Sequence, residues 1–138
     1  MTTTRAASPK KEADATFGPM RSTLNRTPLP ARRTVADWVT LAVEVGRSQP
    51  WASLEEAAQW WCNYSGIQYI LLLKISATGI QMRYALYDIA TLGTLPAPTA
   101  SGTFRRRIAA QPPVNVSFDM HRILSIPAYQ LLSICVSS

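Results

Sequence analysis

The chain has 138 residues, of which 47% are hydrophobic and only 16% charged, so its composition indicates one compact domain and excludes a fully disordered protein. The net charge of +6 is unevenly distributed. Residues 1–33 hold seven basic and two acidic side chains, whereas the rest of the chain holds seven basic and six acidic ones. A basic segment on a near-neutral body is typical of proteins that bind nucleic acid or another anionic surface.

Cysteine usage and hydropathy favour a protein of a reducing compartment. Cys62 and Cys135 are too few for a disulfide framework and lack the spacing of metal ligands, so we expect buried thiols and no metal or cofactor. The N-terminus is polar and lacks the apolar core of a signal peptide. Apolar runs fall far short of the roughly 20 residues that span a bilayer. We therefore expect no membrane partner.

Residues 1–33 predict a flexible basic arm. They are rich in Thr, Ser, Pro and Ala and offer few apolar side chains to a core. We expect the arm to end near Arg33 and a single assembly domain to follow over residues 34–138. The side chains of the arm that we expect to hold RNA phosphates are Arg5, Lys10, Lys11, Arg21, Arg26, Arg32 and Arg33.

Residues 34–46, TVADWVTLAVEVG, carry signals for two structures. Thr34 with Asp37 resembles a capping box, and Gly46 suits the position after a helix. The apolar residues nevertheless alternate as they do in a strand, at Val39, Leu41, Val43 and Val45. For Val35–Val45 we expect a helix, with a strand as the alternative.

A further helix is predicted over residues 54–64. Ser53 suits its N-cap, and Glu55 and Glu56 follow in the expected first turn, where the helix dipole favours carboxylates. The apolar residues recur at helical spacing, at Leu54, Ala57, Ala58 and Trp61.

Residues 67–92 predict a β-hairpin. IQYILLLKI, residues 67–75, is almost continuously apolar, which is typical of a central strand buried on both faces. SATG supplies a turn with Gly79, and IQMRYALYDIATL supplies the partner strand. Lys74 and Arg83 lie near the ends of this hairpin, and a loop rich in Pro, Gly and Ser follows over residues 93–102.

The segment TFRRRIAA, residues 103–110, places three arginines side by side in a chain with few charges. In a strand, Arg105 and Arg107 share one face about 7 Å apart, within reach of neighbouring phosphates, while Arg106 points the opposite way. We expect Arg105 and Arg107 to bind RNA without sequence preference. The alternatives are a solvated patch or a loop from which all three arginines fan outward.

The C-terminal part predicts two more strands. In VNVSFDMH, residues 114–121, the apolar residues expected to face inward are Val114, Val116, Phe118 and Met120, and those expected to face outward are Asn115, Ser117, Asp119 and His121. AYQLLSICV, residues 128–136, predicts a closing strand. The whole pattern predicts an α+β fold: one or two N-terminal helices, then an antiparallel β-rich body of four or five strands, for which a reduced jelly roll is one candidate form.

Catalysis fits the sequence poorly. His121, the single histidine, has Asp119 on the same expected strand face, but no nucleophile elbow surrounds any serine. Phosphate-binding Gly-rich loops and Cys/His clusters are absent from the sequence. We therefore expect a protein that is not an enzyme and has no small-molecule substrate.

Three side chains indicate subunit contacts. Trp60 and Trp61 point about 100° apart on the predicted helix, so one can enter the core while the other stays at its edge and anchors a neighbouring subunit. Arg106 faces away from its two neighbours and needs a carboxylate or a subunit contact. We expect a homo-oligomer.

Four segments resemble the coat proteins of cucumoviruses and their relatives among small plant RNA viruses: WVTLAVEV, LEEAAQWW, SATGIQMRYALYDIATL and VSFDMHRILSIP. The resemblance implies a shell-forming subunit whose basic arm neutralises packaged RNA, located in the virion and in the host cytoplasm. A dimeric nucleocapsid core fits the same element order without a jelly roll.

Two functions follow from the sequence. The first is a viral coat or nucleocapsid protein that self-assembles and packages RNA through the arm and the arginine segment. The second is a non-structural RNA-binding regulator, such as a silencing-suppressor dimer that measures duplex RNA.

Overall fold

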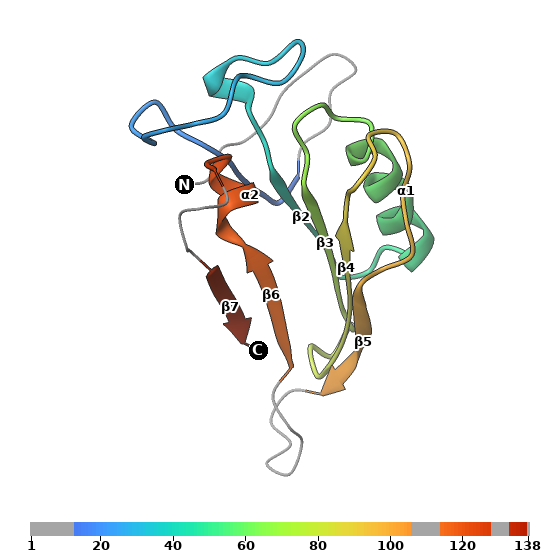
Figure 1. Ribbon diagram of the computed structural model, residues 1–138. Helices are drawn as coiled ribbons and strands as arrows, with labels where there is room; N and C mark the ends of the chain where they lie inside the picture. Colours follow the sequence, from blue (N-terminus) through green and yellow to red (C-terminus); the bar gives the residue numbers. More distant parts are fainter. Residues whose placement is uncertain (1–12, 106–113, 128–132, 138) are drawn as a thin grey trace.

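A five-stranded sheet forms the centre of the protein, with α1 on one face and a two-stranded sheet on the other (Figure 1). The structure is a computed structural model that describes residues 13–105 and 114–127 and the backbone of 133–137. In chain order the elements are β1 (Ala15–Phe17), the 3-10 helix η1 (Val35–Asp37), β2 (Leu41–Gly46), α1 (Trp51–Trp61), β3 (Tyr69–Ile75), β4 (Gln81–Asp88), β5 (Ala100–Arg105), β6 (Asn115–Asp119), α2 (Met120–Leu124) and β7 (Ser133–Ser137).

The sheet order is β1-β2-β3-β4-β5, so every strand lies beside its neighbour in sequence. The pairs β1–β2, β3–β4 and β4–β5 are antiparallel, whereas β2 and β3 are parallel. Parallel neighbours need a crossover connection, and α1 provides it. The β-rich α+β body is therefore present, but the expected all-antiparallel pairing is wrong for β2–β3. A jelly roll contains antiparallel pairs only, so the described strands do not form one.

For Val35–Val45 the alternative of a strand is confirmed from Leu41 onward, and the expected helix is limited to a 3-10 turn. Asp37 accepts a hydrogen bond of 2.6 Å from the backbone N–H of Thr34, as the capping pattern suggested, but the turn extends only over Val35–Asp37. β2 then begins at Leu41, and its burial on both faces outweighs the local helix signal. Of the one or two helices expected before the strands, one is observed as α1, and β1 and β2 precede it.

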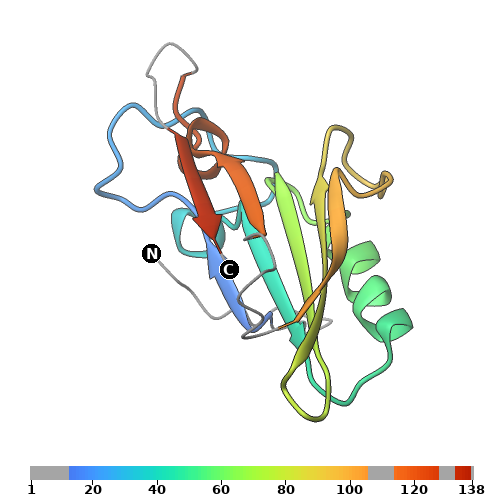
Figure 2. The same cartoon turned by 90° about the horizontal axis from the view of Figure 1, so that it is seen from below.

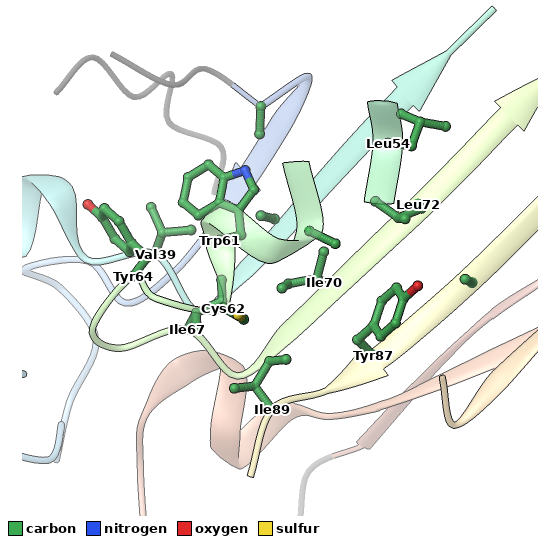
Figure 3. Packing of buried hydrophobic residues seen from close by; sticks show 14 residues of the cluster. Val39, Leu54, Trp61, Cys62, Tyr64, Ile67, Ile70, Leu72, Tyr87 and Ile89 are labelled. Carbon is green, nitrogen blue, oxygen red and sulfur yellow. The ribbon is translucent and has the colours of Figure 1, made fainter. Parts of the chain in front are cut away.

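α1 begins at Trp51, three residues before the predicted start. Pro50 is its N-cap with φ of −62°, so Ser53 lies inside the helix and no acidic side chain occupies the first turn. The predicted apolar face is confirmed, because Leu54, Ala57, Ala58 and Trp61 are all buried. They pack on the sheet with Ile70 and Leu72 of β3 (Figure 3).

β3 and β4 form the expected hairpin, with β3 at the centre of the sheet and Gly79 at φ of +74° in the turn. The strand considered over residues 103–109 begins earlier, at Ala100, and is described as far as Arg105. The rest of that segment lies outside the described residues.

β6 and β7 confirm the two C-terminal strands over 115–119 and 133–137, where they pair antiparallel. Val116 and Phe118 are buried, as expected, and they pack against Leu41 and Tyr69 on the sheet face away from α1. Figure 2 shows β6 and β7 over this face. The strand ends at Asp119, two residues before the predicted end.

His121 is buried and not on an outer strand face as expected. Asp119 accepts a 2.9 Å hydrogen bond from the backbone N–H of His121, which caps α2 and turns the chain. Because the chain is helical from Met120, the alternation of the strand does not extend to His121.

The expected boundary between arm and body at Arg33 needs correction. β1 pairs with β2, and Asp14 Oδ2 accepts a hydrogen bond of 2.6 Å from the N–H of Val45. Arg33 donates to Ser65 O at 2.9 Å and lies 3.2 Å from the ring centre of Tyr64. Within the predicted arm, residues 14–17 and Arg33 therefore contact the body, while residues 1–12 lie outside the described chain.

Arg122 attaches α2 to the sheet. Its guanidinium contacts Asp88 Oδ1 at 2.6 Å and Gln68 Oε1 at 2.9 Å, and it lies 4.5 Å from the ring centre of Tyr69. The hydrogen bond to Asp88 raises the pKa of Arg122, although burial acts in the opposite direction. A single side chain thus joins α2 to both β3 and β4.

Replacing this arginine should destabilise the fold. We expect Arg122→Gln to lower the free energy of unfolding by about 2 kcal/mol, because hydrogen bonds to charged groups contribute about that much. Urea unfolding followed by tryptophan fluorescence measures the change. Arg21→Gln, at an exposed position, is the control and should stay within about 0.5 kcal/mol of the wild type. Equal stability of the two variants would contradict the role given to Arg122.

Candidate nucleic-acid interface

Four basic side chains gather where β2 and β3 end. These side chains, called the basic row below, are Arg47, Lys74, Arg83 and Arg105. Arg47 directly follows β2, while the other three lie on the adjacent strands β3, β4 and β5. This end of the sheet also holds the β3–β4 turn and the first residues of α1, and Figure 1 shows the turn at the bottom of the view.

Strand register places Lys74, Arg83 and Arg105 of the row on the sheet face that α1 covers. Lys74 is directly opposite Arg83, which is opposite Thr103, and Arg105 is opposite Gln81. Directly opposed residues share a face, and alternate residues of a strand do so too. Ala85, two residues beyond Arg83, packs in the core cluster beneath α1, which identifies that face.

Three of the four cations of the row form no salt bridge in the described chain, although Glu55 lines the hollow beside Arg83. Within the chain that the structure describes, no carboxylate oxygen lies within 4.0 Å of Arg47, Lys74 or Arg83. Arg47 extends over the hairpin turn, because a Cβ built on Gly79 would lie 3.5 Å from its guanidinium. Arg83 stacks on Trp51, with 4.0 Å between the guanidinium carbon and the ring centre. The resulting concentration of positive charge suits an anionic ligand.

A hollow of about 240 Å³ adjoins the row between the start of α1 and strands β4 and β5. Its lining includes an aromatic ring, a guanidinium, a carboxylate and three hydroxyls: Trp51, Arg83, Glu55, Tyr87, Ser101 and Thr103. Burial raises the pKa of the Tyr87 hydroxyl, Glu55 raises it further and Arg83 lowers it. The hollow thus offers a stacking surface together with hydrogen-bond donors and acceptors, which is the chemistry that a nucleobase requires.

The expected RNA-binding residues do not form one surface. Arg105 belongs to the basic row, whereas Arg21, Arg26 and Arg32 lie on the loop before η1, near the other end of β2. Arg33 is engaged by Tyr64 and Ser65, as described above. The remaining members of the set, Arg5, Lys10, Lys11 and Arg107, lie outside the described residues.

Sequence reasoning missed most of the basic row. The signal was available in the hairpin, because counting outward from the Gly79 turn places Lys74 opposite Arg83. Arg47 gives no such signal, since only the parallel pairing of β2 with β3 brings it to the turn.

The expected interface residues differ in burial. Trp61 is 0% exposed and donates a 2.8 Å hydrogen bond to Glu44 Oε2, so the expectation that it contacts another subunit is wrong. Trp60 is half-buried at the edge of the core, with its ring centre 4.9 Å from that of Trp61. One indole thus enters the core and the other stays at its rim. Arg106 lies outside the described residues.

The remaining reactive groups of the described chain are His121 and Cys62. His121 Nδ1 lies 2.9 Å from Asp119 Oδ1, and its buried Nε2 has no hydrogen-bond partner among the described residues. Burial raises the pKa of the Cys62 thiol, which opposes its ionisation. The described residues also bring no three His, Cys, Asp or Glu side chains into a metal-binding group.

Comparisons with protein families, curated proteins and solved structures returned no match. The resemblance to plant virus coat proteins therefore stays a prediction. Among the described residues, no helix has both the length and the apolar composition needed to span a membrane.

The direct opposition of Lys74 and Arg83 should cost stability, because like charges that face each other across an antiparallel pair repel. We expect Lys74→Gln to raise the free energy of unfolding by a few tenths of a kcal/mol, up to about 1 kcal/mol, at low salt. Thermal unfolding at two salt concentrations measures the gain, which screening should remove. A loss of stability at low salt would show that Lys74 serves the fold and not a ligand.

Proposed function

We propose that this protein packages RNA as a self-assembling coat or nucleocapsid subunit, which would act in the virion and in the host cytoplasm. The observation that carries the proposal is the basic row. Two of its cations, Lys74 and Arg83, face each other directly without a carboxylate within salt-bridge distance in the described chain. A polyanion that lies along this end of the sheet supplies the missing countercharge.

Single-stranded RNA suits the geometry better than a duplex. The row crosses adjacent strands, so its backbone positions are about 5 Å apart across one pair and about 7–8 Å apart on the diagonal. The hollow beside Arg83 accepts a base that a single strand can turn outward, whereas paired bases are stacked inside a duplex. RNA binding would be sensitive to salt and largely indifferent to sequence.

The arm adds further phosphate contacts in this proposal. Arg5, Lys10 and Lys11 precede β1, and Arg107 follows Arg105 by two residues. The arginines of the loop before η1 are left out, because they lie near the opposite end of β2. An RNA strand on the basic row would have to cross the sheet to reach them.

Assembly is the second part of the proposal, and Trp60 is the side chain that we place in a subunit contact. A half-buried indole at the rim of a core can be buried further by a neighbour, and tryptophan is enriched among interface hot spots. Trp60→Ala should therefore weaken assembly while leaving the RNA affinity of the subunit unchanged.

The test is the affinity for a short single-stranded RNA as a function of salt. For Lys74→Gln combined with Arg83→Gln, we expect the slope of log K against log salt to fall in magnitude by about 1.4, because each phosphate contact to a single strand contributes about 0.7. The control is Arg26→Gln combined with Arg32→Gln, which removes the same amount of charge near the opposite end of β2. This variant should leave the slope unchanged. Equal effects of the two double variants would contradict the assigned site.

Light scattering of the wild type with long RNA at low salt tests assembly. Growth of particles supports the coat or nucleocapsid function. A discrete complex with a short duplex, without growth, would replace it by the duplex-binding regulator.

A further inference from the structure

The loop between β1 and η1 exposes apolar side chains beside arginines. Residues 18–34 are called the apolar-basic loop below. In the described chain the exposed large apolar side chains are Met20, Leu24, Leu29, Ile80 and Leu92, so three of the five lie on this loop. Leu24 is the most exposed of them, at 79%. Between and after them stand Arg21, Arg26 and Arg32. Amphipathic helices bind membrane interfaces through the same combination of exposed apolar and cationic side chains.

Hydrogen bonds hold the loop in this conformation. The N–H of Met20 donates to Thr23 Oγ1 and the N–H of Thr23 donates to Met20 O, each at 3.0 Å, which closes a tight turn. Thr27 N–H donates to Ser125 O at 2.7 Å, which ties the loop to the end of α2. Because the backbone is anchored on both sides of Leu24, this side chain is held outward.

An apolar cavity of about 440 Å³ lies behind the same loop. It lies between β1, β2 and β3 on one side and β6 and α2 on the other, on the face away from α1, and it is partly open to solvent. Its lining includes Phe17, Met20, Val43, Leu71, Phe118 and Ile123, and Thr23 contributes the one side-chain hydroxyl among the lining residues. The volume is within the range of small-molecule sites, and the lining suits a hydrocarbon chain.

We infer that the apolar-basic loop docks on an anionic lipid bilayer and that the cavity accepts one acyl chain from it. Leu24 and Leu29 enter the outer part of the hydrocarbon region. Arg21, Arg26 and Arg32 lie at the level of the headgroups, where their charge attracts anionic lipids. Met20 and Thr23 belong to both the loop and the cavity lining, so the path of an acyl chain starts at the membrane surface.

The observations favour a bilayer on this surface over two alternatives, RNA and a second copy of the chain. RNA phosphates give no reason for Leu24 and Leu29 to be exposed. A second copy related by a two-fold axis would place the three arginines of one loop against those of the other. The proposed lipid site does not depend on the RNA-binding proposal. Docking on a bilayer would contradict the sequence-based expectation that the protein has no membrane partner.

Vesicle flotation tests the docking. We expect the full-length protein to float with phosphatidylcholine vesicles that contain about one third phosphatidylserine, and not with phosphatidylcholine alone. Each of Arg21→Gln and Arg26→Gln should weaken partitioning about five-fold. Leu24→Ser should weaken it as well, whereas Leu92→Ser, at another exposed leucine, should not.

Three outcomes would overturn the docking. They are a failure to float with the anionic vesicles, equal effects of Leu24→Ser and Leu92→Ser, and a change in oligomer size caused by Leu24→Ser in the absence of lipid. The last result would assign the loop to contacts between copies of the chain.

The cavity is tested with a matched pair of variants on β2. Val43 lines the cavity, and Val45 lies two residues further on the same strand face but not among the lining residues. We expect Val43→Phe to fill the cavity and weaken flotation, while Val45→Phe leaves it unchanged. Equal flotation of the two variants would overturn the role of the cavity.

A crosslinking measurement on the wild type does not depend on either variant folding. Phosphatidylserine with a photoreactive acyl chain should label Phe17, Val43 or Phe118 of the cavity lining. Labelling confined to Leu24 and Leu29 would show that the acyl chain stays in the bilayer.

Discussion

The parallel pairing of β2 with β3 is the constraint on which the rest of the structure depends. Two parallel neighbours cannot be joined by a tight turn, so the chain must return along the sheet before β3 begins. α1 makes this return and buries Leu54, Ala58 and Trp61 against the sheet. The same return places the start of α1 beside the end of β2. Trp51 therefore meets Arg83, and Arg47 reaches the β3–β4 turn.

The crossover also separates the two surfaces to which we assign functions. The face beneath α1 is closed by the helix except near its first turn, where the basic row and the hollow lie. The other face receives β6 and α2, which Arg122 fixes to β3 and β4. Between these layers lies the apolar cavity, beside a loop at the far end of β2. The sheet thus places the proposed RNA site and the proposed lipid site at opposite ends.

Short-range sequence patterns were enough to predict some of the elements. The hairpin of β3 and β4, the apolar face of α1 and the alternation in β6 follow from periodicity and a turn glycine. For Leu41–Gly46 the sequence favoured a helix over the alternative strand because Thr34 and Asp37 do form a capping contact, which is a helix signal. Burial in the sheet decides the structure beyond that contact. His121 was misplaced because Asp119 caps a helix that interrupts the alternation. Arg47 joins the basic row only through the parallel pairing of β2 with β3 across α1, and no local pattern in the sequence indicates that pairing.

Hydrogen exchange with and without a short single-stranded RNA tests the central claim most directly, because it maps the contact on the unaltered protein. The account predicts slower exchange in the β3–β4 turn, at the start of α1 and at the end of β5 when RNA is bound. It predicts no change over residues 18–34. Protection of residues 18–34 together with unchanged exchange in the turn would contradict the assignment of RNA to the basic row.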